Sequence, residues 1–245
     1  MNINYAIEDA VEQNHWWFKG RRKIIKNILD RSLVNGENKT ALDLGCGTGA
    51  NIGLFEKYTE VIGLDSSEEA LSYCRKKTKS PLVCGEALQP PFKTNTFSVI
   101  FAMDIFEHID DDARALKGIS KIMKKGGKLL MTCPAFRFLW GGQDEVSGHK
   151  RRYTVKQVCA LLAGEDFIIQ RITYFNMFLF LPILMTRKLL RFLGKRYVHE
   201  NKVNNILMNT LFTWLLNVES LILQYVNLPF GTSILCLAIK GGDDR

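Results

Sequence analysis

The sequence lacks the features that mark secreted, disulfide-stabilised and membrane-spanning proteins. Its six cysteines are scattered and include no CxxC pair, which disfavours a disulfide framework or a zinc finger and favours buried thiols in a reducing cytosol. The first residues, MNINYAIEDAVEQ, contain no apolar signal segment. The longest strongly apolar run, Phe175 to Thr186, is about a dozen residues and contains Asn176 and Pro182, whereas a membrane span needs roughly twenty. We therefore expect a cytoplasmic protein.

The composition is that of an ordinary globular chain, and its basic excess is local. With 245 residues, 47% hydrophobic and 24% charged, the chain has room for one large α/β domain or two small ones. The net charge of +8 first suggests nucleic acid. However, residues 1–166 carry 24 basic and 21 acidic side chains, while Arg171 to Lys202 alone holds 7 basic residues and one acidic residue. We therefore expect nucleic acid not to be the partner.

Short apolar runs alternate with helical or turn segments from residue 40 onward. This alternation is typical of a parallel sheet with crossover helices. Five strands are expected at Ala41–Leu44, Val61–Leu64, Leu82–Val83, Val99–Ala102 and Leu129–Thr132. Helices are expected at Ser66–Lys77, at Asp110–Lys125, closing at Gly126 and Gly127, and at Thr154–Leu162. Two further strands, Phe167–Tyr174 and Ser233–Ile239, would normally form a hairpin.

An insert of roughly 55 residues, Phe175 to Gly231, separates these last two strands, far beyond an ordinary hairpin loop. Its first part predicts a basic amphipathic helix, with Met185, Leu189, Phe192 and Leu193 on one side and Arg187, Lys188, Arg191 and Lys195 on the other. Its second part has an apolar stripe formed by Leu207, Leu211, Trp214, Leu215, Val218, Leu221, Ile222 and Tyr225. The opposite face is polar but almost uncharged: Asn209, Thr213, Asn217, Ser220 and Gln224.

A glycine-rich segment, Asp43 to Asn51, follows the first expected strand. Glycines at alternate positions let the backbone turn tightly and approach a ligand beside the N-terminus of the next helix. Asp65 ends the second strand, where a carboxylate can accept hydrogen bonds from both hydroxyls of a ribose. The alternative for the glycines is a strand-to-helix turn without a ligand, and the alternative for Asp65 is a helix-capping carboxylate.

Five segments in order resemble class I S-adenosylmethionine-dependent methyltransferases of type 11 or 12. They are Leu42 to Gly49, Asp65, Gly85 to Ala87, Phe97 to Ile109 and Lys125 to Leu130. The resemblance covers about residues 40–134. It implies a doubly wound, Rossmann-like α/β fold with a seven-stranded sheet whose last strand is antiparallel. It also implies S-adenosylmethionine as cofactor and S-adenosylhomocysteine as product.

The resemblance implies roles for individual residues around this cofactor. Gly45, Gly47 and Gly49 would wrap its methionine part, and Asp43 would lie near its amino group. Asp65, with Ser66 beside it, would hold the ribose. Glu86 and Ala87 would face the adenine. Asp104 and Ile105 would line the methyl side.

The aromatic segment Asn14 to Arg22 resembles the N-terminal cap that closes over the cofactor in a subgroup of these enzymes. Trp17 would then contact the cofactor, and Arg21 or Arg22 would pair with its carboxylate through two parallel donors. The alternative is an amphipathic helix with aromatic residues on the core and arginines in water.

The polar segment Trp140 to Thr154 follows the fifth strand, at the sheet edge where such folds bind ligands. His149 is a candidate general base because a neutral imidazole can take a proton at working pH. His108 is the rival base, and Asp104 is a third catalytic candidate. Asp144, Arg151, Arg152 and Tyr153 are candidate substrate-binding residues, the basic ones for an anionic group. No metal site is expected. A divalent ion at Asp104, Glu107, His108 and Asp110 to Asp112 is the alternative, but the spacing of these residues more simply suits a loop and a helix N-terminus.

The sequence thus predicts a methyltransferase acting on an oxygen or carbon nucleophile of a small-molecule, saccharide or lipid-linked acceptor. The expected parts are an N-terminal helical cap (1–39), a methyltransferase core (40–174 plus 232–245) and the helical insert (175–231). We expect the insert to cover the acceptor site and to touch an anionic membrane surface; a helical cap or homodimer face is the plainer alternative. The rival functions are an NAD-dependent oxidoreductase and a membrane-docking or scaffold protein with a vestigial cofactor fold.

Overall fold

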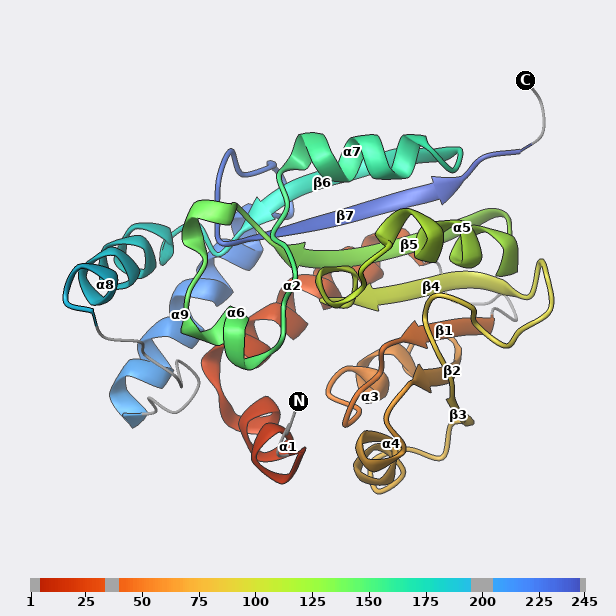
Figure 1. Cartoon of the computed structure of the whole chain (residues 1–245), viewed down its shortest axis with the longest axis horizontal. Helices are drawn as coiled ribbons and strands as arrows, with labels where there is room; N and C mark the ends of the chain where they lie inside the picture. Colours follow the sequence, from red (N-terminus) through yellow and green to blue (C-terminus); the bar gives the residue numbers. More distant parts are fainter. Residues whose placement is uncertain (1–4, 34–39, 195–204, 243–245) are drawn as a thin grey trace.

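The computed structural model describes residues 5–33, 40–194 and 205–242, and these form one mixed α/β structure (Figure 1). The strands are Thr40–Leu44 (β1), Glu60–Asp65 (β2), Leu82–Cys84 (β3), Phe97–Met103 (β4), Met123–Pro134 (β5), Phe167–Phe175 (β6) and Ser233–Lys240 (β7). The α-helices are Tyr5–Asn14 (α1), Trp16–Ser32 (α2), Ile52–Phe55 (α3), Glu68–Cys74 (α4), Asp112–Ile122 (α5), Gly142–Val146 (α6), Val155–Ala163 (α7), Phe180–Phe192 (α8) and Ile206–Ile222 (α9). Two 3-10 helices, Phe106–His108 (η1) and Arg137–Leu139 (η2), follow β4 and β5.

The seven strands form one sheet in the order β3-β2-β1-β4-β5-β7-β6. Neighbours from β3 to β5 are parallel, and β7 runs antiparallel to both β5 and β6. The central strand β4 is almost fully buried because helices cover both faces of the sheet: every residue except Ser98 is buried. The predicted Rossmann-like sheet with an antiparallel last strand is therefore confirmed.

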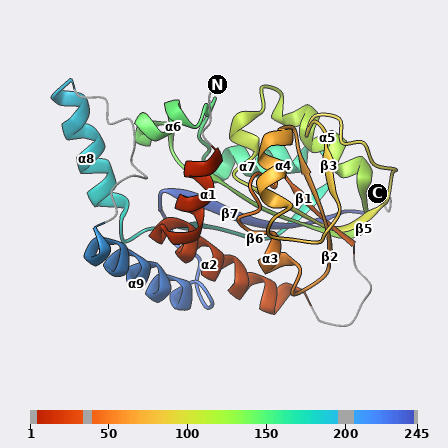
Figure 2. The same ribbon diagram turned by 90° about the horizontal axis from the view of Figure 1, so that it is seen from below.

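Two hydrophobic cores lie on opposite faces of this sheet. Helices α5 and α7 pack on one face, through residues such as Leu116 and Val158. Helices α2, α3 and α9 pack on the other, through residues such as Ile24, Phe55 and Leu216 (Figure 2). Since α2 and α9 share this second core with β1 and β4, the N-terminal segment and part of the insert are packed directly on the sheet.

The helix expected to close at Gly126 ends earlier. Helix α5 stops at Ile122, and Gly126, with φ of +72°, lies inside β5. The register of β4 and β5 shifts between Phe97 and Val99, so the glycine pair accommodates an irregularity in the ladder rather than a helix end. The expectation of buried thiols holds for Cys46, Cys74, Cys133 and Cys236, but Cys84 at the end of edge strand β3 is exposed.

The insert forms two helices, and the second faces the opposite way from its pattern. Leu207, Trp214 and Leu221 of the apolar stripe are 78%, 59% and 57% exposed. The buried side of α9 instead includes Glu219 and Ser220. Polar bonding explains this orientation, because Glu219 accepts backbone hydrogen bonds from residues 176–178. Part of the basic excess, residues 195–202, lies outside the described residues.

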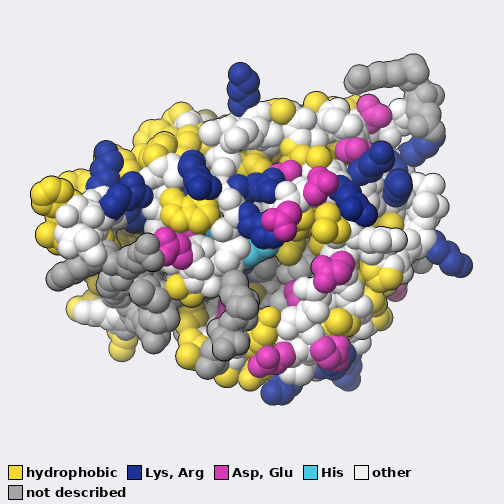
Figure 3. All heavy atoms as spheres, in the orientation of Figure 1, with side chains coloured by type: hydrophobic (Ala, Val, Ile, Leu, Met, Phe, Trp, Pro, Cys, Tyr) yellow, Lys and Arg dark blue, Asp and Glu magenta, His cyan; other side chains and the backbone are white. Residues whose placement is uncertain are grey.

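Helix α8 extends beyond the carboxyl ends of the parallel strands, at the left of Figure 1. None of its residues is buried. Met185, Leu189 and Phe192 are 69%, 57% and 87% exposed, and hydrophobic side chains gather at this end of the space-filling view (Figure 3). The insert therefore presents apolar surface from both of its helices.

Candidate functional site

The glycine-rich segment forms an open backbone cradle at the carboxyl end of β1. Gly45, Gly47 and Gly49 have φ of +71°, +54° and +87°, which residues with a Cβ rarely adopt. A Cβ on Gly47 would meet no atom within 4 Å, so space lies directly beside the backbone. Asp65 joins the cradle: its Oδ2 accepts from the Gly47 N–H at 2.8 Å and its Oδ1 from the Ser67 N–H at 2.9 Å. The carboxylate thus joins the glycine loop to Ser67, the N-cap residue of α4.

Carboxylates converge on this cradle from several elements. Asp43 is buried and its Oδ2 has no hydrogen-bond partner; burial, with the nearby Asp65, raises its pKa to about 7. Helix α1 adds Glu12, whose carboxylate accepts from the Thr48 hydroxyl, and Glu8, whose pKa burial raises to about 7. An orphaned buried acceptor among carboxylates fits a ligand that brings positive charge.

Glu8 and Glu12 were not predicted from the sequence as part of the site. Both lie on α1, whose acidic residues resemble those of an ordinary solvated helix. Only the packing of α1 against α2 and α4 brings them to the glycine loop. A single sequence contains no signal for this contact, because the contact depends on how α1 folds back onto the glycine loop.

Asp104 lies at the end of β4 in a left-handed conformation, with φ of +53°. Its Oδ1 accepts from the Thr132 hydroxyl at 3.0 Å, and its Oδ2 is paired with the Arg21 guanidinium. A non-glycine residue in this region carries backbone strain, which is typical of functional sites. Arg21 is buried, and its Nε has no hydrogen-bond partner. Arg21 therefore reaches the predicted methyl side, while its pairing with a cofactor carboxylate stays a prediction.

The other predicted cofactor residues are spread around this edge of the sheet. Ile105 packs on the cradle, since a Cβ on Gly45 would fall 2.6 Å from its Cδ1. Trp17 is stacked on Phe175 at 5.5 Å between ring centroids. Ser66 and Glu86 are exposed and Ala87 is half-buried, beyond β2 and β3. Contacts of these residues with a cofactor stay predictions.

The loop after β5 holds His149 through a buried ion network. The His149 Nδ1 lies 2.8 Å from Oδ1 of Asp144. Arg152 donates to both oxygens of that carboxylate, at 2.8 and 3.0 Å. Despite burial, the bonds from His149 and Arg152 lower the pKa of Asp144 to about 2. The carboxylate is thus ionised, and it fixes the orientation of the imidazole.

The remaining predicted acceptor residues also have protein partners. Tyr153 is buried and donates to Asp112 at 2.8 Å, and Arg151 forms an ion pair with the same carboxylate at 2.8 Å. In the structure, the loop is therefore anchored by Asp144, Arg152 and Tyr153. Direct contact of these side chains with an acceptor stays untested.

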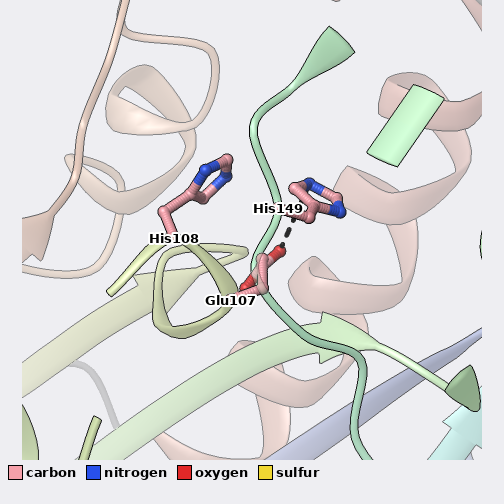
Figure 4. Close-up of side chains that lie close together, drawn as sticks. All are labelled: Glu107, His108 and His149. Carbon is pink, nitrogen blue, oxygen red and sulfur yellow. Dashed lines mark ion pairs between the residues drawn. The ribbon is translucent and has the colours of Figure 1, made fainter. Parts of the chain in front are cut away.

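His108, on η1, faces His149 across the same space, with ring centroids 4.8 Å apart (Figure 4). Burial lowers the pKa of His108 to about 4, so its imidazole is neutral at physiological pH. Beside them, the Glu107 side chain is fully buried, and neither carboxylate oxygen has a hydrogen-bond partner. Histidine surface is visible near the middle of the face in Figure 3, among Lys and Arg side chains. The sequence predicted both histidines here, and it indicated Glu107 only as one of several acidic residues that could hold a divalent ion.

Helix α8 touches this loop through its basic side. Arg187 donates to the carbonyl of Leu139 and lies 3.8 Å from Asp144 Oδ2. Arg191 donates to the carbonyl of Trp140 at 3.0 Å. Both arginines thus bond to this loop, although Arg191, like Lys188, is exposed.

Comparison with known proteins identifies the central part of the chain. Residues 42–131 match a family model described as a methyltransferase domain. A tRNA (carboxymethyluridine(34)-5-O)-methyltransferase of Xenopus tropicalis is 30% identical over 114 residues, 45% of this chain and 17% of the relative. A demethylmenaquinone methyltransferase of Bacillus licheniformis is 33% identical over 122 residues, 46% of this chain and 50% of the relative. The chain thus spans half or less of these two curated relatives.

A solved structure shares the fold over almost its whole length. The S-adenosylmethionine-dependent methyltransferase of Mesorhizobium loti superposes with a TM-score of 0.59 at 15% identity, covering 87% of this chain and 96% of that one. In the part of the chain that the structure describes, none of the helices has the length and apolarity needed to cross a membrane.

Proposed function

Because residues 42–131 match a family model described as a methyltransferase domain, we propose that the whole protein transfers a methyl group from S-adenosylmethionine to an oxygen or carbon nucleophile. The observation that carries the proposal is the glycine cradle next to the unpartnered, buried Oδ2 of Asp43. The amino group of S-adenosylmethionine would complete that acceptor, and its positive charge would balance the surrounding carboxylates.

Bound in the cradle, S-adenosylmethionine supplies a methyl group on a positively charged sulfur. The chain's own residues then hold the donor. Gly45 and Gly47 admit the methionine part, Asp65 reaches the ribose, and Arg21 keeps Asp104 in place at the methyl side. Helix α1 contributes Glu8 and Glu12, so the donor site is covered from the N-terminal side.

We place the acceptor beside Asp104, His108 and His149. Methyl transfer is an in-line displacement, so the enzyme mainly brings donor and nucleophile into contact and keeps water away. A hydroxyl or an acidic carbon must lose a proton during the reaction. The imidazole of His108 is neutral because burial lowers its pKa to about 4, and Asp144 holds His149 in one orientation. These two histidines are the proposed activating groups.

For the acceptor we propose a small or lipid-linked molecule presented at a membrane surface. The support is the exposed apolar side chains of α8 and α9, such as Met185 and Trp214, together with the exposed basic side chain of Lys188 on α8. Apolar area and basic charge together favour an anionic bilayer.

Co-sedimentation with vesicles, with and without anionic lipid, tests the membrane contact. We expect the double variant Trp214→Ser/Leu221→Ser to lose pelleting and Lys188→Glu to weaken it at low salt. Ile168→Ser, which removes an exposed apolar side chain from β6, is the matched control and should pellet like the wild type. Failure of the wild type to pellet, with concentration-dependent dimers in light scattering, would support the homodimer face instead.

Calorimetric titration with S-adenosylhomocysteine and, separately, with NAD tests the cofactor. We expect binding of the first alone, and loss of binding in Asp43→Asn and Asp65→Ala. Arg21→Ala tests whether Arg21 contacts the cofactor in addition to Asp104. If it does, the folded fraction of this variant should bind S-adenosylhomocysteine more weakly than the wild type. Binding of NAD alone would support the oxidoreductase, and binding of neither would support a vestigial cofactor fold.

An RNA acceptor is the second candidate, favoured by one groove of about 480 Å³ next to the glycine loop. Its lining includes six basic side chains: Lys19, Arg22, Lys23, Lys26, Lys57 and Lys77. Such a groove could track a phosphate backbone. Filter binding with tRNA over a salt series tests this: affinity that falls steeply with salt and is lost in Lys23→Glu/Lys26→Glu would favour RNA. No binding at low salt would leave the small or lipid-linked acceptor.

A further inference from the structure

We infer that Glu107, His108 and His149 bind a divalent transition-metal ion at the acceptor side. Their potential ligand atoms all lie within 4.8 Å of one another. Figure 4 shows that the three side chains come from two segments, η1 and the loop after α6, and converge on one space. The inference revises the expectation from the sequence that the chain has no metal site.

The first argument is the state of Glu107. Its side chain has 0% exposure, and both carboxylate oxygens lack a hydrogen-bond partner. An isolated carboxylate without partners is strongly disfavoured in a protein interior. The Nε2 of His149 lies 4.0 Å from Glu107 Oε1, which is too long for a hydrogen bond. A bound cation would satisfy both oxygens at once.

The second argument is the orientation of His149. Its Nδ1 is 2.8 Å from Asp144, and the carboxylate of Asp144 is itself held by Arg152. When Nδ1 donates to a carboxylate, the lone pair is on Nε2, the atom that faces Glu107. A ligand histidine held from behind by a carboxylate is the usual arrangement around protein-bound metal ions.

The third argument is the ligand chemistry. Two imidazole nitrogens and one carboxylate oxygen suit a divalent transition ion such as Zn²⁺, Mn²⁺ or Fe²⁺ better than Mg²⁺ or Ca²⁺, which prefer oxygen. Ligands at about 2.0–2.2 Å from one ion lie about 3–4 Å apart. The 4.0 Å between Glu107 and His149 is close to this, and the half-buried His108 can approach by a side-chain rotation.

The fourth argument is the position of the cluster. Glu107 and His108 follow Asp104 directly after β4, where the proposed methyl acceptor lies. Three protein ligands leave a coordination position for water or substrate. An acceptor hydroxyl bound there would release its proton to water more readily. Its oxygen would then form the bond to the methyl carbon as the sulfur–carbon bond breaks. This role rests on the proposed function, whereas metal binding itself does not.

The test is direct metal binding by the full chain after chelator treatment. Titration with Zn²⁺, Mn²⁺ and Mg²⁺, and visible absorption with Co²⁺ as a spectroscopic probe, should give one ion per chain with preference for the transition metals. Glu107→Gln and His149→Ala should weaken affinity at least about 100-fold, and Asp144→Asn about 10–100-fold. Glu219→Gln is the matched control: this buried carboxylate already accepts three backbone hydrogen bonds, so its loss should leave metal binding unchanged.

Thermal melting gives a second readout that does not depend on activity. Metal should raise the Tm of the wild type and not that of Glu107→Gln. In the metal-free state Glu107→Gln should melt at or above the wild type, because it removes an unpaired buried acid. Wild type that binds S-adenosylhomocysteine but none of the ions, with an unchanged Tm, would overturn the metal inference and leave the proposed function. Metal binding without binding of S-adenosylhomocysteine would support the metal inference and contradict the proposed function.

Discussion

The guanidinium of Arg21, on helix α2, forms a buried ion pair with the carboxylate of Asp104, 83 positions later at the end of β4. The side chains are 6% and 23% exposed. The pair joins the N-terminal segment to the strand end where the chemistry is proposed. Its two partners therefore connect the stability of the fold with the shape of the site.

Removing Arg21 should destabilise the protein strongly. Arg21→Ala leaves Asp104 without its cationic partner, and breaking a buried pair from one side costs about 3–5 kcal/mol. We expect this loss in the free energy of unfolding from urea denaturation. The double variant Arg21→Ala/Asp104→Asn should recover part of it, since the unpaired charge is gone. Strictly additive effects would show that the two residues do not interact.

Gly20 controls how closely α2 and α9 approach. A Cβ at Gly20 would lie 2.3 Å from Cδ1 and 2.6 Å from Cβ of Leu216, so Gly20→Ala should push the helices apart and destabilise the protein by about 1–3 kcal/mol. Gly53→Ala is the control, because a Cβ on Gly53, also helical, meets no atom within 4 Å. Its effect should be neutral or stabilising by up to about 1 kcal/mol. Equal melting temperatures of the two variants would contradict this packing.

His15 should make folding depend on pH below neutrality. Its ring is 2% exposed, its Nδ1 accepts from the Trp17 N–H at 3.3 Å, and burial lowers its pKa to about 4. The unfolded chain, with an ordinary pKa near 6.5, then binds more protons than the folded one between pH 4 and 6.5. Stability should be fully present above pH 6.5 and fall as the pH drops toward 4.

The variant His15→Asn isolates this contribution, because asparagine can still cap α2 but does not titrate. His108, whose pKa is also lowered to about 4, remains in both proteins. Urea midpoints measured from pH 7.5 to 4.5 should therefore fall more steeply in the wild type. Parallel curves would mean that His15 is protonated in the folded state.

The affinity for S-adenosylhomocysteine should rise with pH around neutrality. Pairing with the cofactor amino group needs the ionised carboxylate of Asp43, whose pKa burial raises to about 7. Below pH 7 affinity should increase by up to about tenfold per pH unit, and above it should level off. Asp43→Asn should bind weakly with a flatter profile. Glu8→Gln should keep most of the dependence, which calorimetry at several pH values can check.

The sheet could be predicted because its strands are buried on both faces. In an α/β chain, short apolar runs such as Val99 to Ala102 are rarely anything other than buried strands. Their order along the sequence then determines the crossover topology. The end of α5 was misjudged since Gly126 and Gly127 look like a helix stop, whereas the pairing of β5 with β4 overrides that local signal. Local propensity is a weaker determinant than strand pairing there.

The orientation of α9 could not be predicted from its hydrophobic pattern. The pattern assumes that the apolar side faces the core. Here the buried side carries Glu219, because three backbone N–H groups after β6 need an acceptor. Which backbone groups lack partners is a property of the folded chain.

The candidate site was predicted in part. His149 and Asp144 were both expected in the loop after β5, but only the structure shows that one holds the other. The burial of Glu107 could not be predicted, because it follows from the packing of η1 and the loop. The sequence identifies the residue types at this edge of the sheet, while the fold decides which of them face each other.

The contacts between α2 and α9 also bear on how the chain matures. The Trp16 backbone N–H donates a hydrogen bond to Oδ1 of Asn209, and the Asn27 side-chain amide donates to the carbonyl of Ser220, each across 193 positions. During synthesis, α2 leaves the ribosome long before α9 exists. The apolar side chains of α2 around Ile24 and Ile25 lack this partner until α9 is synthesised. The nascent chain therefore exposes apolar surface of the kind that chaperones bind. The packing of α2 against α9 is completed only when the insert has been translated.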